Sequence, residues 1–174
     1  MLNMPQAEYY VPDFLVQLAI RRRTELAGQP FALIGPDERV WAASAEARGY
    51  GVAEGLAPSH ARARCRPLRT LELDEAEAAD QQQAFLDALG SWQLPTEEIG
   101  YGRAFIALNG VADTAAEARP LAAEMGGRVR GLLGQTLTPA LGFDHGKFTA
   151  SAAADVAGPG RMRLISREDE TVFL

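Results

Sequence analysis

The chain has 174 residues, of which 17 are Lys or Arg and 23 are Asp or Glu, so its formal net charge is −6. Hydrophobic residues make up 47% and charged residues 23%, a composition that is typical of folded soluble proteins and excludes a fibre or a disordered chain. A single cysteine, Cys65, excludes a disulfide framework and a zinc site made of several cysteines. No apolar run approaches the ~20 residues that cross a bilayer, and residues 1–7 lack the features of a signal peptide. We therefore expect a cytoplasmic protein with no membrane partner.

The distribution of cations adds two observations. The negative net charge argues against a freestanding nucleic-acid-binding protein, which usually carries an excess of cations. All but one of the cations are arginine, and the exception is Lys147. Four arginines lie between Arg62 and Arg69, where they could contact DNA phosphates or form a solvated face balanced by the acidic residues at 72–80.

Hydrophobic periodicity and turn residues divide the chain into alternating elements. In chain order these are a helix at 14–23, strands at 31–34 and 40–43, a short helix within 44–55 and another at 59–65, a strand at 68–73, a helix at 74–89, strands at 98–101 and 104–108, a helix at 114–133, a strand at 137–143, a helix at 145–157 and a strand at 162–165. This order predicts an α+β fold of the split βαβ, ferredoxin-like type, with a mainly antiparallel sheet and helices on one face.

Residue types alone do not predict a reaction. His60 and His145 lie in different segments, and no serine sits in a nucleophile-elbow pattern. Cys65 is flanked by arginines that could lower its pKa, but we favour a buried, inert thiol at this position. Composition and periodicity therefore indicate a soluble α+β domain and nothing more specific.

Four stretches, in order, resemble the palm and fingers of Y-family translesion DNA polymerases. The strongest is LTPALGFDHGKFTA at 137–150, which is similar to the family's strand–turn–helix segment. The others are AASAEARGYGV at 42–52, CRPL at 65–68 and the apolar pattern of 14–34. The resemblance implies a palm-like sheet from 1–15 and 66–165, a small fingers insertion at 16–65, and a tail at 166–174 that leads toward a thumb.

In that family, carboxylates hold two Mg²⁺ ions for nucleotidyl transfer. Aligned on Phe14, the two aspartates of the first strand fall on Tyr10 and Pro12. Aligned on the apolar strand at 104–106, the Asp-Glu pair falls on Gly102 and Arg103, and the preceding serine falls on Gly100. The resemblance therefore implies a scaffold without its metal ligands, so we expect no cofactor.

Of the family's other functional positions, two carry different residues here and one pair is kept. The bulky gate against ribonucleotides aligns with Leu15, and a tyrosine that contacts the triphosphate aligns with Ala45. The family's phosphate-contacting pair is kept as Arg48 and Lys147. Without a nucleotide, Arg48 could instead pair with Glu46 or Glu54, and Lys147 could be a solvated residue at a helix start.

Loss of the carboxylates resembles the ImuB-type proteins, which are catalytically inactive relatives in SOS mutagenesis. The resemblance implies a pseudoenzyme in DNA damage tolerance or DNA repair. Its implied partners are an error-prone polymerase, a RecA-related accessory protein, the sliding clamp through a further C-terminal region, and DNA. Two alternatives stay open. One is an active nucleotidyltransferase that binds Mg²⁺ through relocated ligands such as Asp13, Glu98 or Asp144, and the other is a nucleotide-binding module without turnover.

Overall fold

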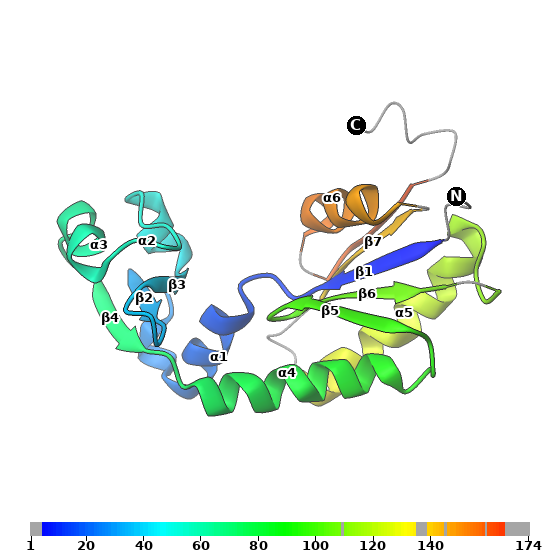
Figure 1. Cartoon of the computed structure of the whole chain (residues 1–174), viewed down its shortest axis with the longest axis horizontal. Coiled ribbons are helices and arrows are strands. Elements are labelled where there is room, and N and C mark those ends of the chain that lie inside the picture. The colour runs from blue at the N-terminus through cyan, green and yellow to red at the C-terminus, as the bar shows by residue number, and fades with distance from the viewer. Residues whose placement is uncertain (1–4, 109, 135–138, 145, 159, 166–174) are drawn as a thin grey trace. The chain divides into compact units, whose positions relative to one another are not determined.

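The computed structural model describes residues 5–108, 110–134, 139–144, 146–158 and 160–165. The chain forms two compact units (Figure 1), one made of residues 1–12 and 81–174 and the other of residues 13–80. The assignment of these parts as palm and fingers stays a prediction. Among the described residues, no helix is both long and apolar enough to span a membrane.

The first unit is built on a five-stranded sheet in the order β5-β6-β1-β7-β8. The first strand of the chain, β1 (Gln6–Tyr10), lies at its centre and runs antiparallel to both neighbours, β6 (Arg103–Ala107) and β7 (Ala140–Asp144). Outside these, β5 (Thr96–Gly100) pairs antiparallel with β6, and β8 (Met162–Leu164) pairs parallel with β7. The mainly antiparallel sheet confirms the predicted α+β class.

Helices cover both faces of this sheet. Successive strand residues point to opposite faces, and two neighbours in β1 reach different helices. The hydroxyl of Tyr9 donates to the carbonyl of Ala122 in α5 (Ala115–Leu133) at 2.9 Å. Glu8 faces the side of α6 (Lys147–Ala157), which packs so closely that a Cβ on Gly142 of β7 would lie 1.9 Å from a backbone oxygen of α6. The predicted placement of all helices on one face was therefore wrong in this detail, because β1 is buried between two helical layers.

The second unit contains a three-stranded sheet in the order β3-β2-β4. The central strand β2 (Phe31–Ile34) runs antiparallel to β3 (Val40–Ala43) and parallel to β4 (Arg69–Glu72). The helical elements of this unit are α1 (Phe14–Arg22), the 3-10 helix η1 (Thr24–Leu26), α2 (Ala45–Gly49) and α3 (Pro58–Arg64). The long helix α4 (Glu75–Gly90) begins in this unit and continues into the first one.

Ser44 and Cys65 both lie in the buried interior of the second unit. The hydroxyl of Ser44 caps α2 by accepting a hydrogen bond from the amide of Ala47 at 3.2 Å, and it also donates to the carbonyl of Gln29 at 2.9 Å. Cys65 is fully buried in the apolar cluster formed by this sheet and α3, as expected for an inert structural thiol.

Candidate functional site

The structure brings together three of the positions at which the family resemblance places metal ligands. Tyr10, at the end of β1, pairs with Arg103, at the start of β6. The amide of Val11 donates to the carbonyl of Gly102 at 2.7 Å, which fixes the neighbouring turn. Gly102 adopts a φ of 68°, a conformation that favours glycine over other residues. The register of one strand pair therefore brings together Tyr10 and Arg103, which are 93 positions apart in the sequence.

The side chain of Arg103 occupies the centre of this cluster. Its Nε donates to Oε1 of Glu8 at 2.7 Å, and one of its terminal nitrogens lies 3.0 Å from Oδ1 of Asp155 and 3.4 Å from Oγ of Ser151. Its guanidinium carbon lies 4.2 Å from the centroid of the Tyr10 ring. One cation thus joins β1, β6 and α6, and we call these five residues the Arg103 cluster.

The electrostatics of the Arg103 cluster depend on burial. Glu8 is completely buried, whereas the Arg103 side chain is 28% exposed. Burial acts to lower the pKa of Arg103, but the hydrogen bond and the charge of Glu8, together with Asp155, outweigh it and leave the pKa above its ordinary value. The guanidinium therefore stays charged at every physiological pH.

The residues of the Arg103 cluster do not fit a divalent cation. Mg²⁺ requires oxygen ligands, preferably free carboxylates. The two carboxylates present, Glu8 and Asp155, already bind the guanidinium of Arg103, and Gly102 offers no side chain. A second cation at this place would be repelled by Arg103.

Glu8 is the member of the Arg103 cluster that the sequence analysis missed. It lies inside the central strand, where apolar residues are the rule, and its charge breaks the apolar pattern of 5–11. One of its carboxylate oxygens, Oε2, has no hydrogen-bond partner among the described residues. A lone acid within a short uncharged stretch was the only available signal.

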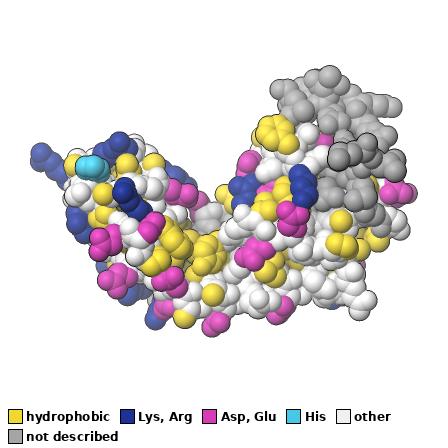
Figure 2. Space-filling view, viewed as in Figure 1, with side chains coloured by type: hydrophobic (Ala, Val, Ile, Leu, Met, Phe, Trp, Pro, Cys, Tyr) yellow, Lys and Arg dark blue, Asp and Glu magenta, His cyan; other side chains and the backbone are white. Residues whose placement is uncertain are grey.

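Lys147, the first residue of α6, is engaged on the same face of the sheet. Its ammonium group forms an ion pair with Glu97 of β5 and lies 5.3 Å from the centroid of the Phe105 ring. Lys147, Ser151 and Asp155 are spaced by four residues, so they share the side of α6 that faces β6. In Figure 2, cationic and anionic side chains accordingly lie next to one another beside this helix.

Arg48 is held by a partner that the sequence did not indicate. Both of its terminal nitrogens contact the carboxylate of Asp13, at 2.7 and 3.0 Å, and one also donates to the carbonyl of Ala43 at 2.7 Å. Asp13 has a left-handed backbone at the start of α1, which aims its carboxylate at α2.

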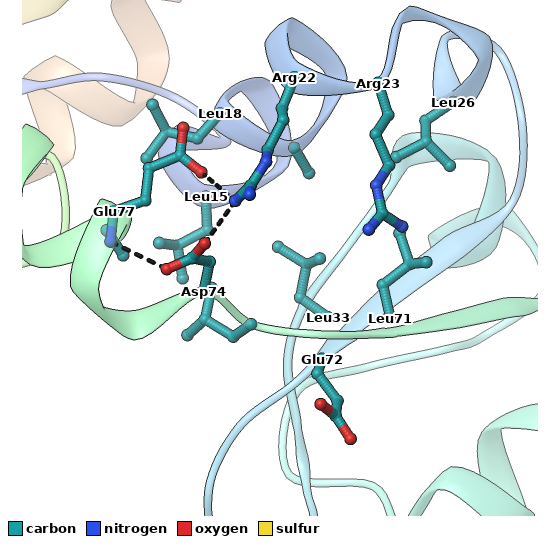
Figure 3. Close-up of a pocket in the computed structure, with 13 residues that line it drawn as sticks. Leu15, Leu18, Arg22, Arg23, Leu26, Leu33, Leu71, Glu72, Asp74 and Glu77 are labelled. Atoms are coloured by element: carbon teal, nitrogen blue, oxygen red, sulfur yellow. Dashed lines mark hydrogen bonds and ion pairs between the residues drawn. The ribbon is translucent and has the colours of Figure 1, made fainter.

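Leu15, the position of the predicted gate, lies in α1 and lines an apolar hollow inside the second unit. Figure 3 shows Leu15 beside Leu18 and Leu33, with Arg22 at the rim. Arg22 donates to Glu77 at 3.0 Å and also pairs with Asp74. Ala45, the position that aligns with the family's triphosphate-contacting tyrosine, is exposed at the start of α2.

The carboxylates proposed as relocated ligands have separate surroundings. Asp13 pairs with Arg48, and Oε1 of Glu98 accepts a hydrogen bond from the side-chain amide of Gln82 at 2.8 Å. Oδ2 of Asp144 accepts from the backbone amide of Gly146 at 3.4 Å. Within the described part of the chain, no three His, Cys, Asp or Glu residues are grouped so that they could hold a metal ion. The residue His145 lies outside the described residues.

The comparison with family models identifies the relationship. The model of the impB/mucB/samB family, IMS, matches residues 9–155, which covers most of the chain. The matched range contains Tyr10, Gly102 and Arg103. No curated protein matches the chain.

Solved structures show the same fold. DinB from Sulfolobus solfataricus superposes with a TM-score of 0.85 at 18% identity, over 98% of this chain and 51% of that chain. A Dbh ternary complex gives 0.83 at 18% identity, over 98% and 50%, and an insertion ternary complex of Dbh DNA polymerase gives 0.81 at 17% identity, over 98% and 51%. The chain therefore spans about half the length of these structures, and at this identity the likeness shows the fold.

Proposed function

The chain belongs to the impB/mucB/samB family, and from this membership we propose that it is a non-catalytic Y-family polymerase-like protein that serves DNA damage tolerance as a binding subunit. The observation that carries the proposal is the Arg103 cluster. A guanidinium stands at a position where the family resemblance places a metal-binding carboxylate, and it is bound by Glu8 at 2.7 Å and Asp155 at 3.0 Å. A protein with this arrangement keeps the polymerase scaffold but lacks the charge pattern that nucleotidyl transfer requires.

The proposed partners are those of the ImuB-type proteins: an error-prone polymerase, a RecA-related accessory protein and the sliding clamp, with DNA as a further ligand. The exposed arginines 62, 64, 66 and 69 are the surface we assign to DNA phosphates if DNA is bound. Dark blue side chains gather on this part of the molecule in Figure 2. Binding of a labelled DNA duplex at two salt concentrations tests this part, because phosphate contacts weaken steeply with salt.

Primer extension tests the absence of catalysis. The protein is incubated with a primed template, all four deoxynucleotides and either Mg²⁺ or Mn²⁺, with an active Y-family polymerase as the control for the substrate. We expect no extension above the protein-free reaction. Robust incorporation that is lost in Glu98→Gln or Asp144→Asn would overturn the proposal and support relocated ligands.

Nucleotide binding without turnover is tested separately by calorimetry with a deoxynucleoside triphosphate. The two cations that the resemblance assigns to the phosphates each bind a carboxylate, Arg48 with Asp13 and Lys147 with Glu97. Both ion pairs would have to open before a triphosphate could bind. We therefore expect no heat at millimolar ligand, and saturable heat that disappears in Lys147→Gln would favour the nucleotide-binding alternative.

A further inference from the structure

A second hollow lies on the opposite face of the five-stranded sheet from the Arg103 cluster. It opens between α5 and the edge formed by β7 and β8 and contains about 570 Å³ of empty space, part of it open to solvent. Its walls are mostly apolar, and its floor includes the ring of Tyr9, whose hydroxyl is already bonded to α5. The lining residues are Tyr9, Ala122, Ala123, Gly126, Arg130, Pro139, Leu141, Gly160, Arg161 and Met162.

The absence of a side chain at Gly126 opens this hollow on its helical side. Gly126 is buried, yet a Cβ built on it would meet no atom within 4 Å. Ala122, Gly126 and Arg130 are spaced by four residues and so lie on one side of α5. The empty space therefore reaches the helix backbone, and the arginine one turn further along borders the same space.

The charge of the hollow is unlike that of the whole chain. Arg130 is half-buried and Arg161 is exposed, and both line the hollow. Among the described residues, the lining includes no acidic side chain. Within the described part of the chain, neither guanidinium forms an ion pair or a side-chain hydrogen bond. In the hollow of Figure 3, by contrast, Arg22 is neutralised by Asp74 and Glu77.

We propose that this hollow is a binding site for a small organic anion, with a carboxylate or a phosphate joined to a short apolar body. Guanidinium groups bind both kinds of anion through paired hydrogen bonds. The side chains of Leu141 and Met162, together with the Tyr9 ring, would contact the apolar part of the ligand. Arg130 and Arg161 form no ion pair among the described residues, so they attract anions locally in a protein whose net charge of −6 repels them.

Amide NMR of the full ¹⁵N-labelled chain tests the site with four probes. Phenylacetate and phenyl phosphate carry both features, 2-phenylethanol lacks the charge, and inorganic phosphate lacks the apolar body. We expect saturable shifts at Gly126 and Gly160 with both organic anions, and at least tenfold weaker binding of the other two. The ratio between phenylacetate and phenyl phosphate then identifies which anionic group the site prefers.

Variants separate the site from unspecific effects. Arg130→Gln and Arg161→Gln should each weaken binding of the organic anions about tenfold without affecting 2-phenylethanol. Gly126→Leu should abolish binding by filling the hollow. Gly127→Leu is its matched control, because Gly127 is exposed and also has no atom within 4 Å of its Cβ position.

Three results would overturn the proposal: equal binding of 2-phenylethanol, equal binding of inorganic phosphate, or shifts that do not saturate. Equal binding in the two arginine variants would do the same. Arg130 is half-buried and Arg161 is exposed, so the two arginine variants should fold normally. They therefore test the proposal even if Gly126→Leu does not fold. The outcome is independent of the primer-extension result.

Discussion

The ion pair between Glu8 and Arg103 should be the most strongly coupled polar interaction of the first unit. We expect Arg103→Met to destabilise the protein severely, because it leaves the carboxylate of Glu8 buried without its cation. Glu8→Leu should cost less, since Arg103 keeps its contact with Asp155 and is 28% exposed to water. The double variant should recover most of the loss, because both charges are then replaced by apolar groups of similar size.

The magnitude follows from burial. Removing one partner of a buried pair costs about 3–5 kcal/mol, and the partial exposure of Arg103 favours the lower end, about 3 kcal/mol. Glu8→Leu should cost about 1–2 kcal/mol, in the range for losing a hydrogen bond to a charged group. The coupling energy from the double-mutant cycle should then be about 2–3 kcal/mol.

Equilibrium unfolding in urea, followed by far-ultraviolet circular dichroism, measures these free energies. The matched control is Arg128→Met, which removes an arginine from an exposed pair with Glu124 and should cost about 1 kcal/mol or less. A coupling energy below about 0.5 kcal/mol would refute the reasoning, because the two side chains would then contribute independently.

Three further predictions concern single side chains. Burial raises the pKa of Tyr9 above its ordinary value, so its contribution to the free energy of unfolding is complete below pH ~10 and decreases as the pH rises beyond it. Tyr9→Phe should cost about 1 kcal/mol at pH 7 and should reduce the loss of stability above pH ~10. Urea unfolding at pH 7, 10 and 11 measures both effects. Gly142→Ala should displace α6 and lower the melting temperature, because its Cβ would lie 1.9 Å from the Ala150 oxygen, whereas Gly146→Ala should be tolerated. Thr114→Ala should cost about 1 kcal/mol by removing the capping box of α5, while Thr114→Ser should not.

Much of the secondary structure could be predicted from the sequence, because turns and apolar runs carry it locally. The strands at 31–34 and 40–43 were predicted with the bounds the structure shows, and the helix at 114–133 within one residue. The central strand β1 was the main omission of the pattern-based prediction. Its segment, Gln6–Tyr10, contains a buried glutamate, so its burial does not show as an apolar run.

The contacts of the Arg103 cluster could not be predicted from the sequence. The resemblance named Tyr10 and Arg103 as ligand positions, which stays a prediction, and the register of β1 against β6 pairs these two residues. The partners of Arg103 come from elements that begin at residues 6 and 147, and no local spacing connects them. For the same reason the sequence did not indicate that Arg48 pairs with Asp13, which is 35 residues away.

The burial of Glu8 restricts which side chains position 103 can carry. With an acid at position 103 in place of Arg103, its carboxylate would lie close to that of Glu8, which is completely buried and two residues along β1 from Tyr10, the partner of position 103. Like charges at such a distance destabilise a folded protein unless a cation lies between them. Arg103 supplies such a cation as part of the chain, through its ion pair with Glu8. Replacing Arg103 with an acid should therefore be tolerated only when Glu8 is replaced as well.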